Sequence, residues 1–120
     1  MENPDAYELL HRGRRLLAEG NTHSAVIVLE RAAIAEPKKA SIREALARAL
    51  FNSGQTTKAK EEFSMVIELD PSNDFGYFGL GLCYARAGKW AEARGQIKLA
   101  IAMRPEIERY RDALRGLPAA

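Results

Sequence analysis

The sequence has very little of what internal crosslinks or metal sites require. Of its 120 residues, one is cysteine, Cys83, and two are histidine. A lone cysteine has no internal disulfide partner, and no Cys/His spacing typical of a zinc site is present. We therefore expect a protein of the reducing cytoplasm that uses no metal or other cofactor.

Long apolar runs and a strong charge of one sign are also missing. No apolar stretch approaches the roughly 20 residues that a helix needs to cross a bilayer. The first residues, Met1 to Asp5, are acidic where a secretory signal is basic. Eighteen Lys and Arg against sixteen Asp and Glu give a formal charge of +2. This balance argues against a membrane or nucleic acid as the partner, and only a pI near 8.8 and the arginines favour nucleic acid.

What the sequence does contain is a period of 34 residues. Prolines, glycines and alanines recur at this spacing in three independent series: Pro37, Pro71 and Pro105; Gly20, Gly54 and Gly88; Ala25, Ala59 and Ala93. A shared period indicates tandem copies of one structural unit. At 120 residues with 47% apolar content, the copies fit within a single domain.

Each unit reads as a helix, a short turn, a second helix and a proline break. The glycine follows the first helix, where a left-handed cap favours a residue without Cβ, and the proline ends the second helix. First helices are predicted over 5–18, 39–52 and 73–86, and second helices over 22–35, 56–69 and 89–103. Small residues on the first helices, Gly13, Ala47 and Gly81, are expected to face the alanines of the second helices, Ala25, Ala59 and Ala93. Larger residues of the second helices are expected to fill the space between neighbouring pairs: Leu29, Phe63 and Ile97, with Ala32, Val66 and Ala100.

These units resemble the tetratricopeptide repeat family. The first copy does so through Leu9, Gly13, Leu16, Ala25, Leu29, Ala32 and Pro37, and the third through Tyr77, Leu80, Gly81, Tyr84, Ala93, Ile97, Ala100 and Pro105. The middle copy departs at Arg43, in the place of Leu9 and Tyr77, and at Val66. The resemblance implies an all-α right-handed solenoid of seven helices: repeats 6–39, 40–73 and 74–107, a capping helix at about 106–115 and a flexible tail, 116–120. Small free-standing arrays of this kind resemble bacterial proteins.

Motifs for catalysis are weak in this sequence. Gly76, Gly79 and Gly81 superficially suggest a dinucleotide loop, but Tyr84 stands where the third glycine is needed and no strand precedes. Close helix packing explains these glycines better. His11 and His23 have no triad or metal partners and are predicted to be surface residues, and Cys83 a buried apolar one. We predict that the protein is not an enzyme.

The resemblance implies that the first helices line a concave surface on which ligands bind. The family's inner-face positions fall here on Tyr7, Leu10, Arg14, Leu17, Ser41, Glu44, Arg48, Phe51, Phe75, Phe78, Leu82 and Arg86, followed by Arg109 and Asp112 of the capping helix. Such a mixture of aromatics, leucines and arginines is expected of a peptide-binding surface. Phe75, Phe78 and Leu82 could instead complete packing against the second or capping helix. The arginines could be solvated, with Glu44 and Arg48 pairing on one helix face.

The predicted function is to bind a peptide or amphipathic helix of a partner protein, with acidic groups near the arginines. The alternative is self-assembly, in which the same groove receives a second copy or the tail 117–120. One branch of the family grips the free carboxylate of chaperone tails with Lys, Asn and Arg. That clamp is absent here, because the corresponding places hold Leu10, Arg14, Ala45, Phe75 and Gly79.

Overall fold

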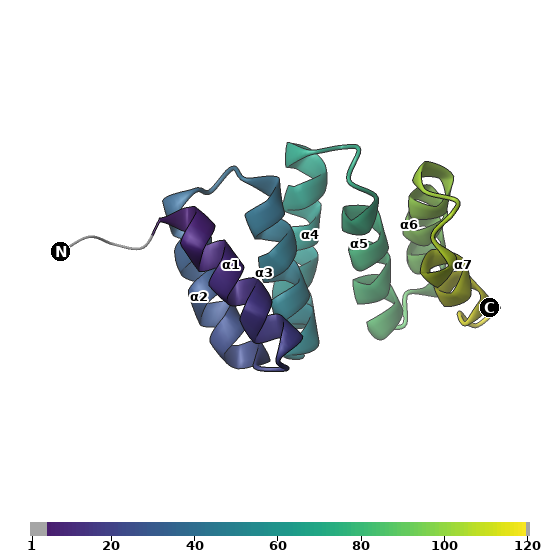
Figure 1. Cartoon of the computed structure of the whole chain (residues 1–120). Helices are drawn as coiled ribbons and strands as arrows, with labels where there is room; N and C mark the ends of the chain where they lie inside the picture. The colour runs from purple at the N-terminus through teal and green to yellow at the C-terminus, as the bar shows by residue number, and fades with distance from the viewer. Residues whose placement is uncertain (1–4, 120) are drawn as a thin grey trace.

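The computed structural model describes residues 5–119, and this part of the chain is built from α-helices joined by short turns (Figure 1). The helices are α1 (Ala6–Ala18), α2 (Thr22–Ala35), α3 (Ala40–Asn52), α4 (Thr56–Leu69), α5 (Asp74–Arg86), α6 (Trp90–Met103) and α7 (Glu108–Arg115). The predicted helices are confirmed to within two residues at each end. Four of the predicted first residues, Asp5, Lys39, Asn73 and Lys89, precede their helices as N-caps.

Two of these N-caps satisfy a free backbone donor of the helix that they start. An Asp5 Oδ1 oxygen accepts from the backbone N–H of Glu8 at 2.8 Å, and Asn73 Oδ1 accepts from Gly76 at 2.8 Å. The first N–H groups of a helix have no partner within it, so short Asp and Asn side chains stabilise a helix start at these positions.

A glycine in the left-handed conformation ends the first helix of each unit. Gly20, Gly54 and Gly88 have φ angles of 82°, 87° and 76°. In the first unit the N–H of Asn21 donates to the carbonyl of Leu16 at 2.8 Å, and Gly20 donates to Leu17 at 3.0 Å. This is the Schellman arrangement, which satisfies the last carbonyls and turns the chain back on itself. The predicted role of these glycines is confirmed.

Gly88 and Gly95 provide a matched pair of glycine-to-alanine substitutions. Gly88→Ala should lower the free energy of unfolding by about 1 kcal/mol, because alanine is strained at positive φ. Gly95 lies inside α6, and a Cβ added there would meet no atom within 4 Å, so Gly95→Ala should raise stability by about 0.5–1 kcal/mol through helix propensity. Urea denaturation followed by circular dichroism measures both. Equal changes in the free energy of unfolding, with the same sign, would contradict the assignment of Gly88 to a left-handed cap and of Gly95 to a helix interior.

The helices stack in chain order into an elongated array of 55 × 25 × 22 Å, with α1 at one end and α7 at the other (Figure 1). Each unit pairs its two helices, and α2 packs on α3 and α4 on α5. The first helices also contact one another, α1 with α3 and α3 with α5, whereas the second helices of the described chain make no comparable contact. The layer of first helices is therefore the inner side of the bend, as expected for the predicted all-α solenoid.

Large second-helix residues fill the space that the small first-helix residues leave. Leu29 and Ile97 are fully buried, and Phe63 nearly so. A Cβ at Gly13 would lie 2.4 Å from Leu29 Cγ, and one at Gly81 would lie 2.7 Å from Ile97 Cγ1. The glycines thus admit large side chains from the other helix of the same pair, so Leu29 and Ile97 fill space within their own pairs and not only between pairs, as was predicted. The predicted close helix crossing is confirmed in this form.

The departure at Arg43 has a structural explanation. In the third unit, the Tyr77 hydroxyl donates to the carbonyl of Pro71 at 3.1 Å. One period earlier, Arg43 Nε donates to the carbonyl of Pro37 at 2.9 Å, and its Nη1 forms an ion pair with Glu62 at 3.0 Å. Arginine therefore replaces tyrosine and keeps the hydrogen bond to the carbonyl of the proline, while Glu62 neutralises the charge that the substitution brings.

The predicted capping helix is present as α7 and covers the third unit. Tyr110, 3% exposed, stacks on Phe78 with ring centroids 4.5 Å apart and donates a hydrogen bond to Asp74 at 2.5 Å. Within the predicted tail, Leu117 packs into this cluster and the Pro118 carbonyl accepts from an Arg94 guanidinium at 2.6 Å. Residue 120 lies outside the described part of the chain.

Candidate functional site

The predicted inner-face residues differ widely in exposure. The exposed ones are Tyr7, Arg14, Arg48, Arg86, Arg109 and Asp112; the half-buried ones are Leu17, Ser41, Glu44, Phe51, Phe75 and Leu82; the buried ones are Leu10 and Phe78. Most of the predicted set is therefore at least partly accessible. The prediction needs correction for Tyr7, whose ring packs against that of His11, a residue outside the predicted set.

Phe78 and Leu10 need correction as ligand-contacting residues. Phe78 is 1% exposed because the ring of Tyr110 covers it, and Leu10 is 5% exposed within the core that joins the first two units. Phe78 thus faces the capping helix α7. The alternative that the apolar stripe of α5 completes packing against the capping helix is correct for Phe78. Phe75 and Leu82 lie half-buried at the edge of the same cluster.

Arginines lie over phenylalanine rings along the inner layer. The closest case joins two units: the Arg86 guanidinium carbon lies 3.5 Å from the centroid of the Phe51 ring. Arg86 also donates to the carbonyl of Phe51 at 2.8 Å and to the Thr56 hydroxyl at 3.1 Å. This side chain is held by the C-terminal end of α3, so its contribution is to join α5 to α3.

Two further arginines lie more loosely over rings. Arg48 lies 5.5 Å from the Phe75 centroid, and Arg109 lies 5.3 Å from that of Phe78. Cation–π contacts at exposed sites contribute about 0.5–1 kcal/mol. Arg48 and Arg109 therefore keep guanidinium donors available to a ligand while their stems cover the aromatic rings.

The open part of the inner layer lies between α1 and α3. A hollow of about 220 Å³ is lined there by Arg14, Leu17, Ala18, Arg48 and Asn52. Within residues 5–119, neither Arg14 nor Arg48 forms a salt bridge. The sequence interpretation missed Ala18 and Asn52, although the 34-residue period places both at the position of Arg86, which it had included.

Glu44 is the half-buried acid of this layer, at the position that Leu10 and Phe78 occupy in the other units. Burial raises the pKa of Glu44, while the charge of Arg48 and a hydrogen bond from Asn73 act in the opposite direction. The net result is a raised pKa, so these neighbours offset only part of the cost of burying the Glu44 carboxylate.

The groups with possible chemical reactivity do not converge. Cys83 is 1% exposed, and burial raises the pKa of its thiol to about 11, so it stays protonated at neutral pH. His11 and His23 are exposed, as predicted. Residues 5–119 contain no group of three or more His, Cys, Asp or Glu arranged to hold a metal ion.

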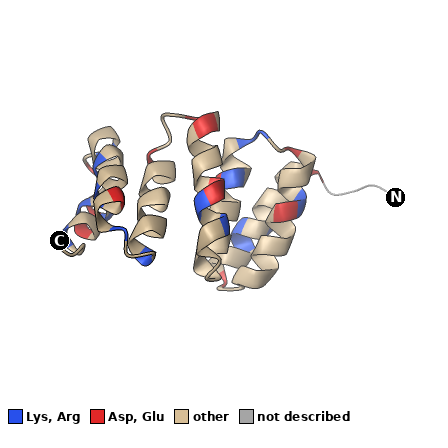
Figure 2. Cartoon of the chain, turned by 180° about the vertical axis from the view of Figure 1, so that it is seen from behind, with Lys and Arg blue, Asp and Glu red and all other residues tan. Residues whose placement is uncertain are grey.

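In the same range, no helix is both long and apolar enough for a membrane crossing. Figure 2 shows acidic and basic residues interleaved along the helices seen from behind.

Family models for "Tetratricopeptide repeat" match residues 16–77, more than half of the chain, and residues 76–106. Superkiller complex protein 3 of Mus musculus is 33% identical over 108 residues, which are 90% of this chain but 7% of that protein.

Two solved structures have the same fold at low sequence identity. YrrB, described as a TPR protein with an unusual peptide-binding site, has a TM-score of 0.89 at 21% identity over 94% of this chain and 58% of its own. The first TPR of Spaghetti (RPAP3), bound to the HSP90 peptide SRMEEVD, has a TM-score of 0.88 at 18% identity over 96% and 91%. With the repeat geometry, the left-handed glycine caps and the family models in agreement, the chain belongs to the tetratricopeptide repeat family.

Proposed function

We propose that the inner layer, in its open half between α1 and α3, binds an acidic peptide segment of another protein. The observation that carries the proposal is the pair of exposed guanidinium groups, Arg14 and Arg48, on neighbouring helices beside the half-buried Leu17. Guanidinium groups bind carboxylates through paired hydrogen bonds, and Leu17 offers an apolar contact between them. A peptide lying across the two helices would therefore meet both kinds of contact.

The similar structures support a peptide as the ligand. YrrB is described as having a peptide-binding site, and the Spaghetti domain holds a peptide with three acidic residues, SRMEEVD. The positions of the family's carboxylate clamp include Leu10 and Ala45, which are buried here, so the peptide termini have no such clamp. We therefore expect recognition of internal acidic side chains rather than of a free C-terminus.

The alternative of self-assembly through the same groove has less support. Two of the apolar residues that a second copy would contact, Leu10 and Phe78, are buried within the chain. Leu117, the apolar residue of the tail, packs against the chain's own capping cluster. Light scattering over a range of concentrations tests this alternative directly, and a dimer that dissociates when Phe75 is changed to glutamate would restore it.

The test of the proposal selects peptides from a random phage-displayed library on the wild-type protein and measures their affinity by fluorescence anisotropy. We expect acidic sequences, with binding to Arg14→Gln/Arg48→Gln weakened about tenfold or more through loss of two charge-assisted contacts. Lys58→Gln/Lys98→Gln removes the same charge from exposed positions of α4 and α6 and is the control. Selected peptides without acidic residues, or equal affinities for both variants, would refute the proposed site.

A further inference from the structure

One side of α1, which no other helix of residues 5–119 covers, differs from the matching side of α5. In α5 this side receives α4: a Cβ at Gly79 would lie 2.2 Å from the Phe63 ring, and one at Gly76 would lie 3.1 Å from Val66. Two periods earlier, the same positions hold His11 and Glu8. The positions that receive a helix in the third unit are thus occupied in α1 by large polar residues.

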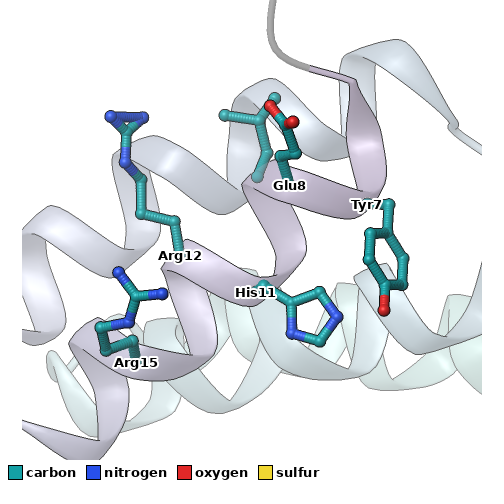
Figure 3. A pocket seen from close by; sticks show the side chains of 6 residues that line it. Tyr7, Glu8, His11, Arg12 and Arg15 are labelled. Carbon is teal, nitrogen blue, oxygen red and sulfur yellow. The ribbon is translucent and has the colours of Figure 1, made fainter.

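At two more positions, residues that are buried in α5 correspond to large polar residues in α1. Leu80 and Cys83 of α5 are 8% and 1% exposed, whereas their counterparts in α1 are Arg12 and Arg15, both exposed. Together with Tyr7, the side chains of Glu8, His11, Arg12 and Arg15 border a hollow of about 450 Å³ that Leu9 also lines (Figure 3). We call this surface the α1 edge.

The arrangement of the α1 edge separates an aromatic end from a cationic end. Tyr7, 69% exposed, meets His11 edge to face with ring centroids 4.2 Å apart. Figure 3 shows these two rings side by side, with Arg12 and Arg15 farther along the helix. A ligand lying along α1 would therefore meet an amphipathic ring first and two positive charges one to two turns later.

The α1 edge carries more unpaired positive charge than an exposed end of a repeat array needs to stay in contact with water. A terminal repeat needs a polar outer face, and mixed charges supply one. At the opposite end of the array, α7 pairs Arg115 with Asp112 in an ion pair. At the α1 edge, Arg12 and Arg15 form no salt bridge with any residue in 5–119, and Glu8 is the one acid beside them in the hollow. The surface therefore complements a negatively charged partner.

We propose that the α1 edge is a second docking surface, which binds an acidic amphipathic helix of a partner protein. The helix lies where α4 lies on α5, held farther out by the arginine side chains. Its carboxylates bind Arg12 and Arg15, and one of its apolar side chains rests on the Tyr7 ring. Arg14 lies two residues from Arg12 and so points to another side of α1, which separates this surface from the inner layer. The inference is independent of peptide binding there.

The probe is an acetylated 16-residue synthetic helix of glutamate and alanine with two leucines seven residues apart, titrated into ¹⁵N-labelled protein. We expect the largest amide shift changes within residues 7–16. Affinity should fall about tenfold in Arg12→Gln/Arg15→Gln, because two charge-assisted contacts are lost. It should change less than about twofold in Lys58→Gln/Lys98→Gln, which removes equal charge elsewhere.

Three results would overturn the inference. Shift changes confined to the inner layer and abolished by Arg14→Gln/Arg48→Gln would assign the probe to the first site and make the α1 edge a solvated end. Equal weakening in Arg12→Gln/Arg15→Gln and Lys58→Gln/Lys98→Gln would show binding through net charge alone. Absence of any shift change at millimolar probe would show that the α1 edge does not bind an acidic helix. The substituted residues are exposed, and circular dichroism verifies that each variant keeps the wild-type fold.

Discussion

Phe78→Ala is expected to lower the free energy of unfolding by about 3–5 kcal/mol, the range for truncating a fully buried aromatic side chain. The ring is 1% exposed and lies in one cluster with Ile97, Ala100 and Tyr110, so its removal leaves a cavity between the third unit and α7. Urea denaturation provides the measurement. Phe75→Ala, at a half-buried position of the same helix, is the control and should cost clearly less.

Because Phe78 and Tyr110 are in contact, their substitutions should not have additive effects on the free energy of unfolding. In a double-mutant cycle, Phe78→Ala and Tyr110→Ala together should cost less than the sum of their separate losses by about 0.5–3 kcal/mol, as for residues in direct contact. Tyr110→Phe keeps the ring and removes only the hydrogen bond to the Asp74 carboxylate, so it should cost about 1.5–3 kcal/mol. Additive losses, or a Phe78→Ala variant as stable as Phe75→Ala, would mean that Phe78 does not anchor the cap.

The features of the fold that could be predicted from the sequence are those that a residue determines through its own backbone or through the repeat period. A glycine with positive φ and a proline that cannot continue a helix act through their own backbone, so their 34-residue spacing is enough to place the helices and turns. Gly54, at φ 87°, and the end of α4 at Leu69, two residues before Pro71, follow these rules. The same period assigned Leu29 and Phe63 to the core, since their positions recur in each unit.

The exposure of the inner layer has distant causes and was harder to predict. Phe78 and Phe75 look alike in the sequence, yet Phe78 is buried by Tyr110, which lies 32 residues farther along the chain. Arg86 also reads as a free cation, whereas it donates to the Phe51 carbonyl of the preceding first helix. Which side chains remain open to a ligand depends on such contacts between units, and the residue types alone do not specify them.

Gly79→Ala should destabilise the protein by about 1–3 kcal/mol, the usual cost of overpacking a close-packed core. The added Cβ would lie 2.2 Å from Phe63 Cε1, and the Phe63 ring is 2% exposed, so it has little room to move away. Alanine gains up to about 1 kcal/mol of helix propensity over glycine, which offsets part of this cost. Gly95→Ala, in open space on α6, measures that gain separately.

Reducing the opposing ring should reverse the effect. Phe63→Leu alone leaves a cavity beside Gly79, whereas Phe63→Leu with Gly79→Ala places a methyl group into the vacated space. The double variant should therefore be more stable than the sum of the two single losses predicts, by about 0.5–3 kcal/mol. Strict additivity would show that Gly79 is not required by the approach of α4 to α5. In that case His11, which occupies the position of Gly79 in α1, would no longer be evidence that a helix cannot pack closely against the α1 edge.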